Sequence, residues 1–428
     1  MELEKPETPQ EISENLIHFI ARSPSVFHGV HGIKAALLYS GFTEIREEDP
    51  WHIEKGGKYV VTRNGSALIA FTVPEEGARS FRIIASHCDS PTFKIKENPE
   101  MKKGPYVTLN VEGYGGMIMS TWLDRPLSVA GRLIVRENGH LAEKLAAVDG
   151  TMLVIPSVAI HMDRNVNHKK DWNIQTDLSP LYGMTGGKSS FLDVVAASAG
   201  VKKEDILAHD LYLYSRVPGT LWGEDREFIS SPKLDDLQCA FAAFRGFVAG
   251  KKEKAISLYA LFDNEEVGSG TANGAGSTFL SNILLRLSLS LGYSYDETMA
   301  MIAGSFMISA DNAHSVHPNH EEYADPVNRP VINKGIVIKY NAQQRYATDA
   351  LSAARFKNLC EEIHIPTQTF TNRSDNLGGS TLGNISNTKV AMPTVDIGLS
   401  QLAMHSSYET AGTLDTAYLA AASAKFFD

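Results

Sequence analysis

Short apolar runs that end in carboxylate or histidine side chains recur along this sequence, and they constrain the fold more than any other feature. The run "SLYALF" leads into "DNEEVGSG", and "FRIIAS" leads into "HCDSP". "SFMIS" stands just before Asp311, and "PTVDIG" a few residues before His405. Amphipathic segments such as "DDLQCAFAAFRGFVAG" and "FLSNILLRLSLSLG" alternate with these runs. Buried strands that alternate with helices predict an α/β layer fold with a largely parallel sheet.

The pattern changes between residues 98 and 232. The segments "YVTLNVEG", "LSVAGRLIVRENGHLAEKL" and "GTMLVIPS" alternate apolar and polar residues, and Asn138-Gly139 is a strong signal for a β-hairpin. We therefore predict a β-rich domain over residues 98–232. It interrupts an α/β/α domain with a mostly parallel central sheet, whose two parts are residues 1–97 and 233–428.

The composition narrows the class of protein. The 428 residues are 43% hydrophobic and 21% charged, as in ordinary soluble globular proteins. The net charge of −10 argues against nucleic acid or an anionic membrane as a partner. No run approaches the ~20 apolar residues that span a membrane. Three scattered cysteines fit a reducing compartment, and the N-terminal segment lacks the layout of a signal peptide, so we predict a cytoplasmic protein.

The polar residues after the apolar runs are candidates for one site, because ligands of open α/β sheets bind beyond the carboxyl ends of the strands. These residues are His87, Asp89, Glu265, Glu266, Asp311 and His405, together with Asp235 and Asp236 ahead of a predicted helix. Each of them alone is better explained as loop polarity. Together, their imidazole and carboxylate groups are the ligand types of catalytic zinc sites, so their joint placement predicts a metal site.

A site for two metals ~3.5–4 Å apart needs one shared carboxylate and further ligands on each ion. The residues allow an arrangement in which Asp235 bridges, His87 and Asp311 bind one ion, and Glu266 and His405 bind the other. Glu265 then stays free to act as a general base. Asp89 can accept a hydrogen bond from the second ring nitrogen of His87.

Several longer motifs of the chain closely resemble the aspartyl aminopeptidase family of two-zinc metallo-aminopeptidases. They are "SHCDSP", "STWLDRPLSVAGRL", "IHMDRNVN", "SPKLDDL", "LFDNEEVGS", "SADNAHSVHPN", "KYNAQQRYA" and "QLAMHSSYE". The motifs come in the family's order and cover nearly the whole chain. The resemblance implies a catalytic α/β domain interrupted by a β-rich dimerisation domain. It also implies homodimers that assemble into a larger particle, a tetrahedral dodecamer.

The resemblance assigns roles to individual residues. It implies the same five metal ligands, His87, Asp235, Glu266, Asp311 and His405, with Asp235 bridging two zinc ions. It makes Glu265 the general base and Asp89 its helper. His161 in "AIHMDRNVN" corresponds to a histidine that reaches a neighbouring subunit's active site or serves as a metal ligand. Lys339 in "IVIKYNAQQRYA" corresponds to a lysine that meets an acidic first residue of the substrate.

Two stretches depart from the family's pattern. Many relatives carry Asp-Asn where this chain has Asp235-Asp236. The stretch "NRSDNLGGSTLG" also differs from the Arg-Asn-Asp sequence that is usual in the same region of the family. Neither change removes a predicted metal ligand. The second change makes the predicted substrate preference less certain than the predicted reaction.

We therefore predict a zinc-dependent aminopeptidase that removes N-terminal residues, acidic ones first, from peptides with a free amine. Manganese or cobalt can replace zinc at nitrogen and oxygen ligands of this kind. Alternative functions are an aminopeptidase of broad or neutral specificity, a related two-metal N-acyl hydrolase, and a non-catalytic shell or cargo-binding protein. The complete ligand set disfavours the last.

Overall fold

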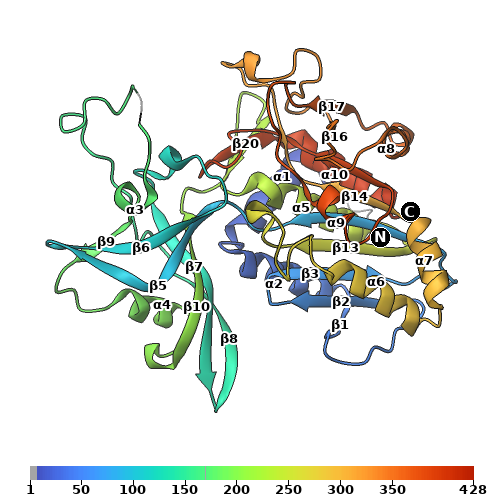
Figure 1. Cartoon of the computed structure of the whole chain (residues 1–428), viewed down its shortest axis with the longest axis horizontal. Helices are drawn as coiled ribbons and strands as arrows, with labels where there is room; N and C mark the ends of the chain where they lie inside the picture. The colour runs from blue at the N-terminus through green and yellow to red at the C-terminus, as the bar shows by residue number, and fades with distance from the viewer. Residues whose placement is uncertain (1–6, 169) are drawn as a thin grey trace.

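The molecule has two parts, a larger one at the right of Figure 1 and a smaller one at the left. The structure is a computed structural model and describes residues 7–168 and 170–428. The larger part is built on a nine-stranded sheet of the described residues, in the order β1-β2-β3-β13-β4-β14-β18-β16-β17. Its strands are β1 (Thr43–Glu44), β2 (Lys58–Arg63), β3 (Ala67–Thr72), β4 (Phe81–His87), β13 (Ile256–Phe262), β14 (Phe306–Ala310), β16 (Ile336–Tyr340), β17 (Thr367–Thr371) and β18 (Thr394–Gly398).

The central strands of this sheet run parallel. β4 pairs in parallel with both β13 and β14, and β14 pairs in parallel with β18. The side chains of β13 alternate between two apolar cores, with Tyr259 and Leu261 in one and Leu258 and Ala260 in the other. A strand that is buried on both faces reads as an unbroken apolar run, which explains "SLYALF".

Helices cover both faces of the large sheet, as expected for an α/β/α fold (Figure 1). The core on one face takes residues from α1, α2, α5, α8 and α10, and the core on the other face from α6, α7 and α9. These helices are α1 (Pro9–Ala21), α2 (Val26–Tyr39), α5 (Leu234–Ala249), α6 (Phe279–Ser290), α7 (Tyr295–Ala303), α8 (Ala350–Glu362), α9 (Leu382–Ser386) and α10 (Thr413–Phe426). The predicted α/β fold with a mostly parallel sheet is confirmed.

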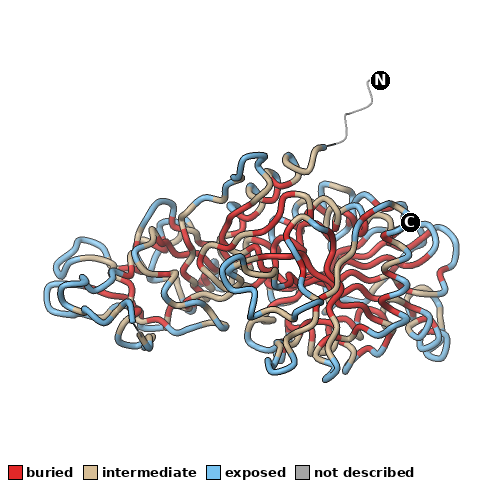
Figure 2. The backbone as a smooth tube through the Cα atoms, turned by 90° about the horizontal axis from the view of Figure 1, so that it is seen from above, coloured by how far each residue is buried: buried red, intermediate tan, exposed pale blue. Residues whose placement is uncertain are grey.

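The smaller part contains a six-stranded sheet of the order β8-β7-β10-β5-β6-β9. Its elements are β5 (Thr92–Lys103), β6 (Tyr106–Tyr114), β7 (Leu127–Glu137), β8 (His140–Ala147), β9 (Leu181–Met184), β10 (Ile206–Ser215) and the helices α3 (Ile174–Asp177) and α4 (Phe191–Ser198). Asn138 and Gly139 adopt positive φ angles of 52° and 82° between β7 and β8, so the predicted hairpin is present. Figure 2 shows buried backbone inside this part as well, and Phe93 and Phe191 belong to its separate core.

A third sheet joins segments that are far apart in sequence. Its order is β11-β12-β20-β19-β15, with β11 (Thr220–Trp222), β12 (Phe228–Ser231), β15 (Ala313–His314), β19 (Ser400–Leu402) and β20 (Glu409–Gly412). The predicted domain boundaries at residues 97 and 232 stay predictions. β5 runs across the first of these positions, and β12 ends just before the second.

One local prediction was wrong. "GTMLVIPS" forms isolated bridges and not a strand, from Leu153 to Leu127, from Val154 to Leu181 and from Ile155 to Leu123. Its backbone pairs with three different partners in turn, so no continuous ladder extends along it. No helix among the described residues is long and apolar enough to cross a membrane.

Candidate active site

The candidate site lies where the central parallel strands end. His87 is the last residue of β4, and Asp311 directly follows β14. Glu265 and Glu266 follow β13 after a two-residue turn in which Asn264 has a φ of 60°. Phe262, the last residue of β13, is in register with His87, so the parallel pairing itself brings the two strand ends together.

The five predicted ligands converge with Glu265 into groups that can hold metal ions. Within each group one ligand atom per residue lies within 4.8 Å of the others. The groups are His87, Asp235 and Asp311; His87, Glu265 and Glu266; and Asp235, Glu266 and His405. The groups overlap, as expected for a site that holds more than one ion through shared carboxylates.

Asp235 occupies the middle of this cluster. Its Oδ1 lies 3.6 Å from His87 Nε2 and its Oδ2 lies 3.3 Å from His405 Nε2, so each oxygen faces a different histidine. His405 Nε2 is also 3.3 Å from Glu266 Oε2. Asp235 Oδ1 and Glu266 Oε1 are buried without a hydrogen-bond partner among the described residues. Such orphaned oxygens are costly unless a cation or water binds them, so the donor set fits zinc.

The electrostatics of the site also favour a bound cation. Burial raises the pKa of Glu265 to about 8 and that of Glu266 well above its ordinary value. Burial raises the pKa of Asp311 too, against the pull of the nearby Lys339 cation. At Asp235, burial acts to raise the pKa, but the nearby His405 and His87 imidazoles outweigh it and lower the pKa. Carboxylates that are crowded in this way hold their charge best beside positive ions.

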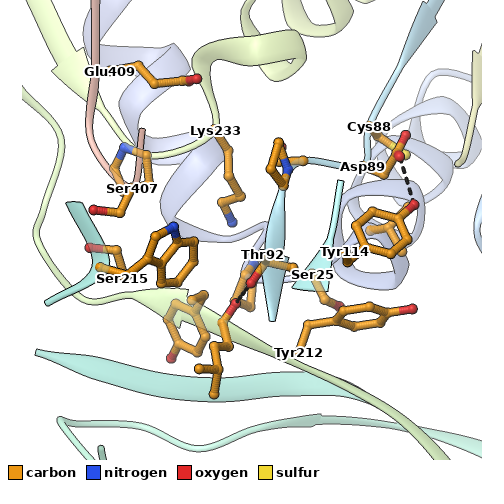
Figure 3. A pocket seen from close by; sticks show the side chains of 18 of the residues that line it. Ser25, Cys88, Asp89, Thr92, Tyr114, Tyr212, Ser215, Lys233, Ser407 and Glu409 are labelled. Carbon is orange, nitrogen blue, oxygen red and sulfur yellow. Dashed lines mark hydrogen bonds between the residues drawn. The ribbon is translucent and has the colours of Figure 1, made fainter. Parts of the chain in front are cut away.

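Asp89 holds the turn that carries both glutamates. Its Oδ1 accepts the Glu265 backbone N–H at 3.2 Å, and its Oδ2 accepts that of Glu266 at 3.1 Å. His87 Nδ1 is hydrogen-bonded to the backbone carbonyl oxygen of Asp89 at 3.1 Å and lies 3.3 Å from Asp89 Oδ1, so Asp89 orients the histidine mainly through its backbone. The Tyr114 hydroxyl donates to Asp89 Oδ2 at 2.7 Å (Figure 3). Tyr114 comes from β6 of the smaller part and was not predicted from the sequence.

Glu409 is a second supporting carboxylate that sequence reasoning missed. Its side chain is buried, its Oε2 accepts the backbone N–H of Asp235 at 3.0 Å, and its Oε1 accepts that of His405 at 2.7 Å. It therefore fixes the bridging carboxylate and a histidine with respect to each other. Asp236, also buried, accepts the backbone N–H of His87 at 3.2 Å, and a cis peptide bond joins it to Asp235. The local sequence "HSSYE" does not indicate that Glu409 holds these two backbone N–H groups.

His405 connects the two parts of the molecule. It has a φ of 67°, and its Nδ1 lies 2.7 Å from the carbonyl oxygen of Gly116 in the smaller part. Gly115 has a φ of 74°, and a Cβ atom there would come within 3.1 Å of Glu266 Cβ. A glycine therefore allows the backbone of the smaller part to approach the site closely.

Lys339 is a buried cation next to the cluster. Its Nζ lies 3.5 Å from Asp311 Oδ2 and 5.7 Å from the ring centre of Tyr346. Burial lowers the pKa of Lys339, but Asp311 outweighs this effect and the pKa is raised overall. The Phe370 ring lies 6.0 Å from the His314 ring and 6.4 Å from the Tyr346 ring, so the three rings form an aromatic group, of which Tyr346 contacts Lys339, that the sequence did not reveal.

His161 is not brought to the cluster. It is exposed in the turn region that follows Ile155, and it belongs to none of the candidate metal groups of the described residues. Its predicted role therefore depends on a second subunit.

Comparisons with known proteins agree with this geometry. The family described as "Aminopeptidase I zinc metalloprotease (M18)" matches residues 19–427. A "Probable M18 family aminopeptidase 2" of Clostridium acetobutylicum is 46% identical over 427 residues, which are 98% of this chain and 99% of that protein. The solved structure of the Ape4 and Nbr1 complex has a TM-score of 0.95 at 33% identity, covering 98% of this chain and 86% of that chain. The S. cerevisiae mApe1 dodecamer has a TM-score of 0.86 at 26% identity, covering 98% and 96%.

These matches confirm the family that the motifs indicated. They cover the α/β strands, the β-rich segment and the whole candidate site together. The chain belongs to the M18 family of zinc metallo-aminopeptidases, which are hydrolases that act on peptides.

Proposed function

We propose that this chain removes acidic residues, Asp or Glu, from the N-terminus of peptides, with two zinc ions and Glu265 as the general base. The observation that carries the proposal is the central position of Asp235, whose two oxygens face His87 and His405 at 3.6 Å and 3.3 Å. The orphaned oxygens of Asp235 and Glu266 support it further, because they need cations in place of hydrogen-bond donors.

Asp235 would bridge the two ions. His87 and Asp311 would complete one site, and Glu266 and His405 the other. Bound zinc supplies Lewis acidity, which lowers the pKa of water and polarises the scissile carbonyl. Manganese and cobalt suit the same nitrogen and oxygen donors.

Glu265 is suited to move the proton. Its carboxylate has no hydrogen-bond partner among the side chains that the structure describes, while its backbone N–H is held by Asp89. In the metal-free chain burial raises the pKa of Glu265 to about 8. Bound cations would lower this pKa, so that the ionised carboxylate accepts a proton near neutral pH. Glu265 takes a proton from the attacking water and returns it to the leaving amine.

Lys339 is the candidate for substrate selection. It is buried near the end of β16 with Asp311 as its ion-pair partner, and the ring centre of Tyr346 lies 5.7 Å from its Nζ. A buried cation favours a carboxylate side chain, and a hydrogen bond to a charged group contributes ~1.5–3 kcal/mol. The Asp311 carboxylate competes with the substrate for the Lys339 ammonium. The preference for acidic substrates therefore depends on how far a bound metal ion neutralises Asp311.

Assembly completes the proposal. The S. cerevisiae relative is a dodecamer, and we propose that this chain forms a homo-oligomer through its β-rich segment, built from dimers in a tetrahedral arrangement. His161, exposed and remote from the ligand cluster of its own chain, would then reach the active site of a neighbouring subunit.

Substrate amides test the chemistry and the specificity separately. The purified protein is assayed with chromogenic amides of Asp, Glu, Leu and Lys, and with N-acetylated forms, before and after chelation and zinc addition. We expect chelator-sensitive activity led by Asp or Glu, and none on the acetylated forms. Activity led by Leu would keep the metal chemistry and remove the acidic preference, whereas cleavage of acetylated substrates would indicate an N-acyl hydrolase.

The Lys339→Met variant addresses the pocket directly. The expected result is a loss of about tenfold or more in kcat/KM for Asp amide, with a smaller change for Leu amide. Equal losses for both amides would show that Lys339 supports the site without reading the substrate.

A further inference from the structure

Asp396 is a buried carboxylate in β18 that the proposed chemistry does not use. It is 1% exposed and belongs to none of the candidate metal groups of the described residues. Its parallel partner in β14 is Ser309, two residues before the predicted ligand Asp311, so Asp396 lies behind the metal site in the sheet. A buried carboxylate is costly unless donors hold it, so its hydrogen bonds indicate its role.

Asp396 ties down the segment that carries Tyr346. Its Oδ2 accepts the backbone N–H of Ala347, and its own backbone N–H donates to Thr348 Oγ1 at 2.9 Å. These two residues directly follow Tyr346. The Tyr346 ring centre lies 5.7 Å from Lys339 Nζ, so the bonds to Asp396 fix where this ring stands relative to the cation.

The same carboxylate holds the start of α9. Its Oδ1 accepts the Thr381 hydroxyl at 2.7 Å, and Thr381 is the residue just before the helix. A Cβ atom at Gly383 would come within 2.6 Å of this oxygen, so a glycine lets the first turn of α9 approach the carboxylate. Both residues lie in "NRSDNLGGSTLG", the stretch that departs from the family's usual sequence. One side chain thus joins this stretch to the segment around Tyr346.

Lys339 stands across from Asp396 in the sheet. β16 and β18 pair antiparallel with Val337 opposite Gly398, and two positions further along this register Lys339 is opposite Asp396. Opposed residues point to the same face of a sheet. Lys339 pairs directly with Asp311, at 3.5 Å. Burial lowers the pKa of Lys339, whereas Asp311 and, from farther away, Asp396 raise it.

Metal binding would increase the importance of this second carboxylate. Asp311 is a predicted ligand, and a carboxylate that coordinates a metal ion shares its charge with that ion. Asp396 would then be the carboxylate that offsets the Lys339 charge from within the sheet. It keeps a counter-charge near the buried ammonium before an acidic substrate arrives.

We propose that Asp396 is a positioning residue for substrate selection, which holds Tyr346 and the start of α9 around Lys339 and offsets the charge of the lysine. The inference rests on the proposed selection of acidic substrates by Lys339. Because Asp396 is buried behind the metal site, it acts through Lys339 and Tyr346. Its loss should therefore change the choice between substrates more than it changes kcat.

The Asp396→Asn variant tests this role, because Asn keeps the size of the side chain, replaces one acceptor oxygen by an NH₂ group and removes the charge. We expect the ratio of kcat/KM for Asp amide to that for Leu amide to fall about tenfold in the zinc-loaded protein, mainly through KM for Asp amide. The matched control is Asp415→Asn, because Asp415 is also buried and accepts two backbone N–H groups, and this variant should keep the wild-type ratio. Equal losses for both amides in the Asp396 variant would overturn the proposal.

Hydrogen exchange tests the positioning without any substrate. In the zinc-loaded Asp396→Asn protein, the amides of residues 341–349 should exchange at least about threefold faster than in wild type, because Ala347 loses its carboxylate acceptor. In the Asp415→Asn protein the same segment should exchange as in wild type. Unchanged exchange in the Asp396 variant would show that other contacts hold the Tyr346 segment, and would overturn the proposal.

The outcomes separate this inference from the function on which it rests. A wild type that does not prefer Asp amide would refute the proposed specificity, while exchange would still decide whether Asp396 holds the Tyr346 segment. Faster exchange with an unchanged Asp-to-Leu ratio, in a wild type that does prefer Asp amide, would overturn selection by Asp396. If Asp396→Asn fails to fold, Thr381→Val removes only the 2.7 Å bond and should lower the ratio about threefold; an unchanged ratio would then overturn the proposal.

Discussion

Replacing Glu409 by Gln is the sharpest test of how the metal site is held. The Glu409 carboxylate accepts the backbone N–H of Asp235 at 3.0 Å and that of His405 at 2.7 Å. Gln keeps one acceptor and turns an amide NH₂ toward the other N–H. The loss of one hydrogen bond to a buried charged group costs ~1.5–3 kcal/mol of folding stability. The freed backbone carries a predicted zinc ligand, so zinc affinity should fall about 10–100-fold.

The chain contains a matched control for this experiment. Asp415 is also buried and accepts two backbone N–H groups, from Asn333 at 2.7 Å and from Gly335 at 3.2 Å. Burial raises the pKa of Asp415 to about 7 and that of Glu409 to about 8, so the two carboxylates have similar environments. Asp415→Asn should lower the melting temperature by a similar amount and leave zinc affinity unchanged.

Zinc affinity is measured by competition with a chromophoric chelator, and stability by thermal unfolding of the same samples. A selective loss of zinc affinity in the Glu409→Gln protein would establish Glu409 as a positioning residue. The reasoning is refuted if both variants lose zinc equally, or if neither does while both are destabilised.

Three further predictions concern the base, its support and the effect of pH. Glu265→Gln should lower kcat by ~10²–10⁴-fold while zinc content by elemental analysis stays near wild type, and a kcat within about tenfold of wild type would exclude Glu265 as the base. Tyr114→Phe removes the 2.7 Å hydrogen bond to Asp89 and should lower kcat with little change in KM for Asp amide; an unchanged kcat would show that Asp89 holds the turn unaided. Burial lowers the pKa of His405, but Asp235 outweighs it and raises the pKa to about 9. Protonated His405 therefore adds stability to the metal-free protein that is fully present below about pH 6.5 and is lost as the pH rises through about 9. The melting temperature should fall over this window, and less so in His405→Asn; a flat profile would contradict the pairing.

Four of the residues that carry the proposed chemistry could be found from the sequence because each stands at the end of a strand. A strand buried on both faces is written as an apolar run, so its end is visible without any tertiary information. His87, Glu265, Glu266 and Asp311 all follow such runs, and parallel pairing brings the ends of neighbouring strands to one edge of the sheet.

The supporting residues could not be found in this way. Glu409 bonds to Asp235 across 174 residues of sequence, and Gly116 lies 289 residues before its partner His405. Neither residue stands in a pattern that local periodicity can detect. Tyr114 is a similar case, because its role arises only where the smaller part packs against the larger one.

The sequence by itself determined the α/β class, the hairpin at Asn138-Gly139 and the set of side chains gathered at the strand ends, because periodicity and turn chemistry are local properties. The tertiary structure alone decided which backbone groups hold those side chains and which charges share a pair, as Lys339 and Asp311 do. These features depend on burial and on contacts between distant segments, and only the packed chain brings those segments within hydrogen-bonding distance.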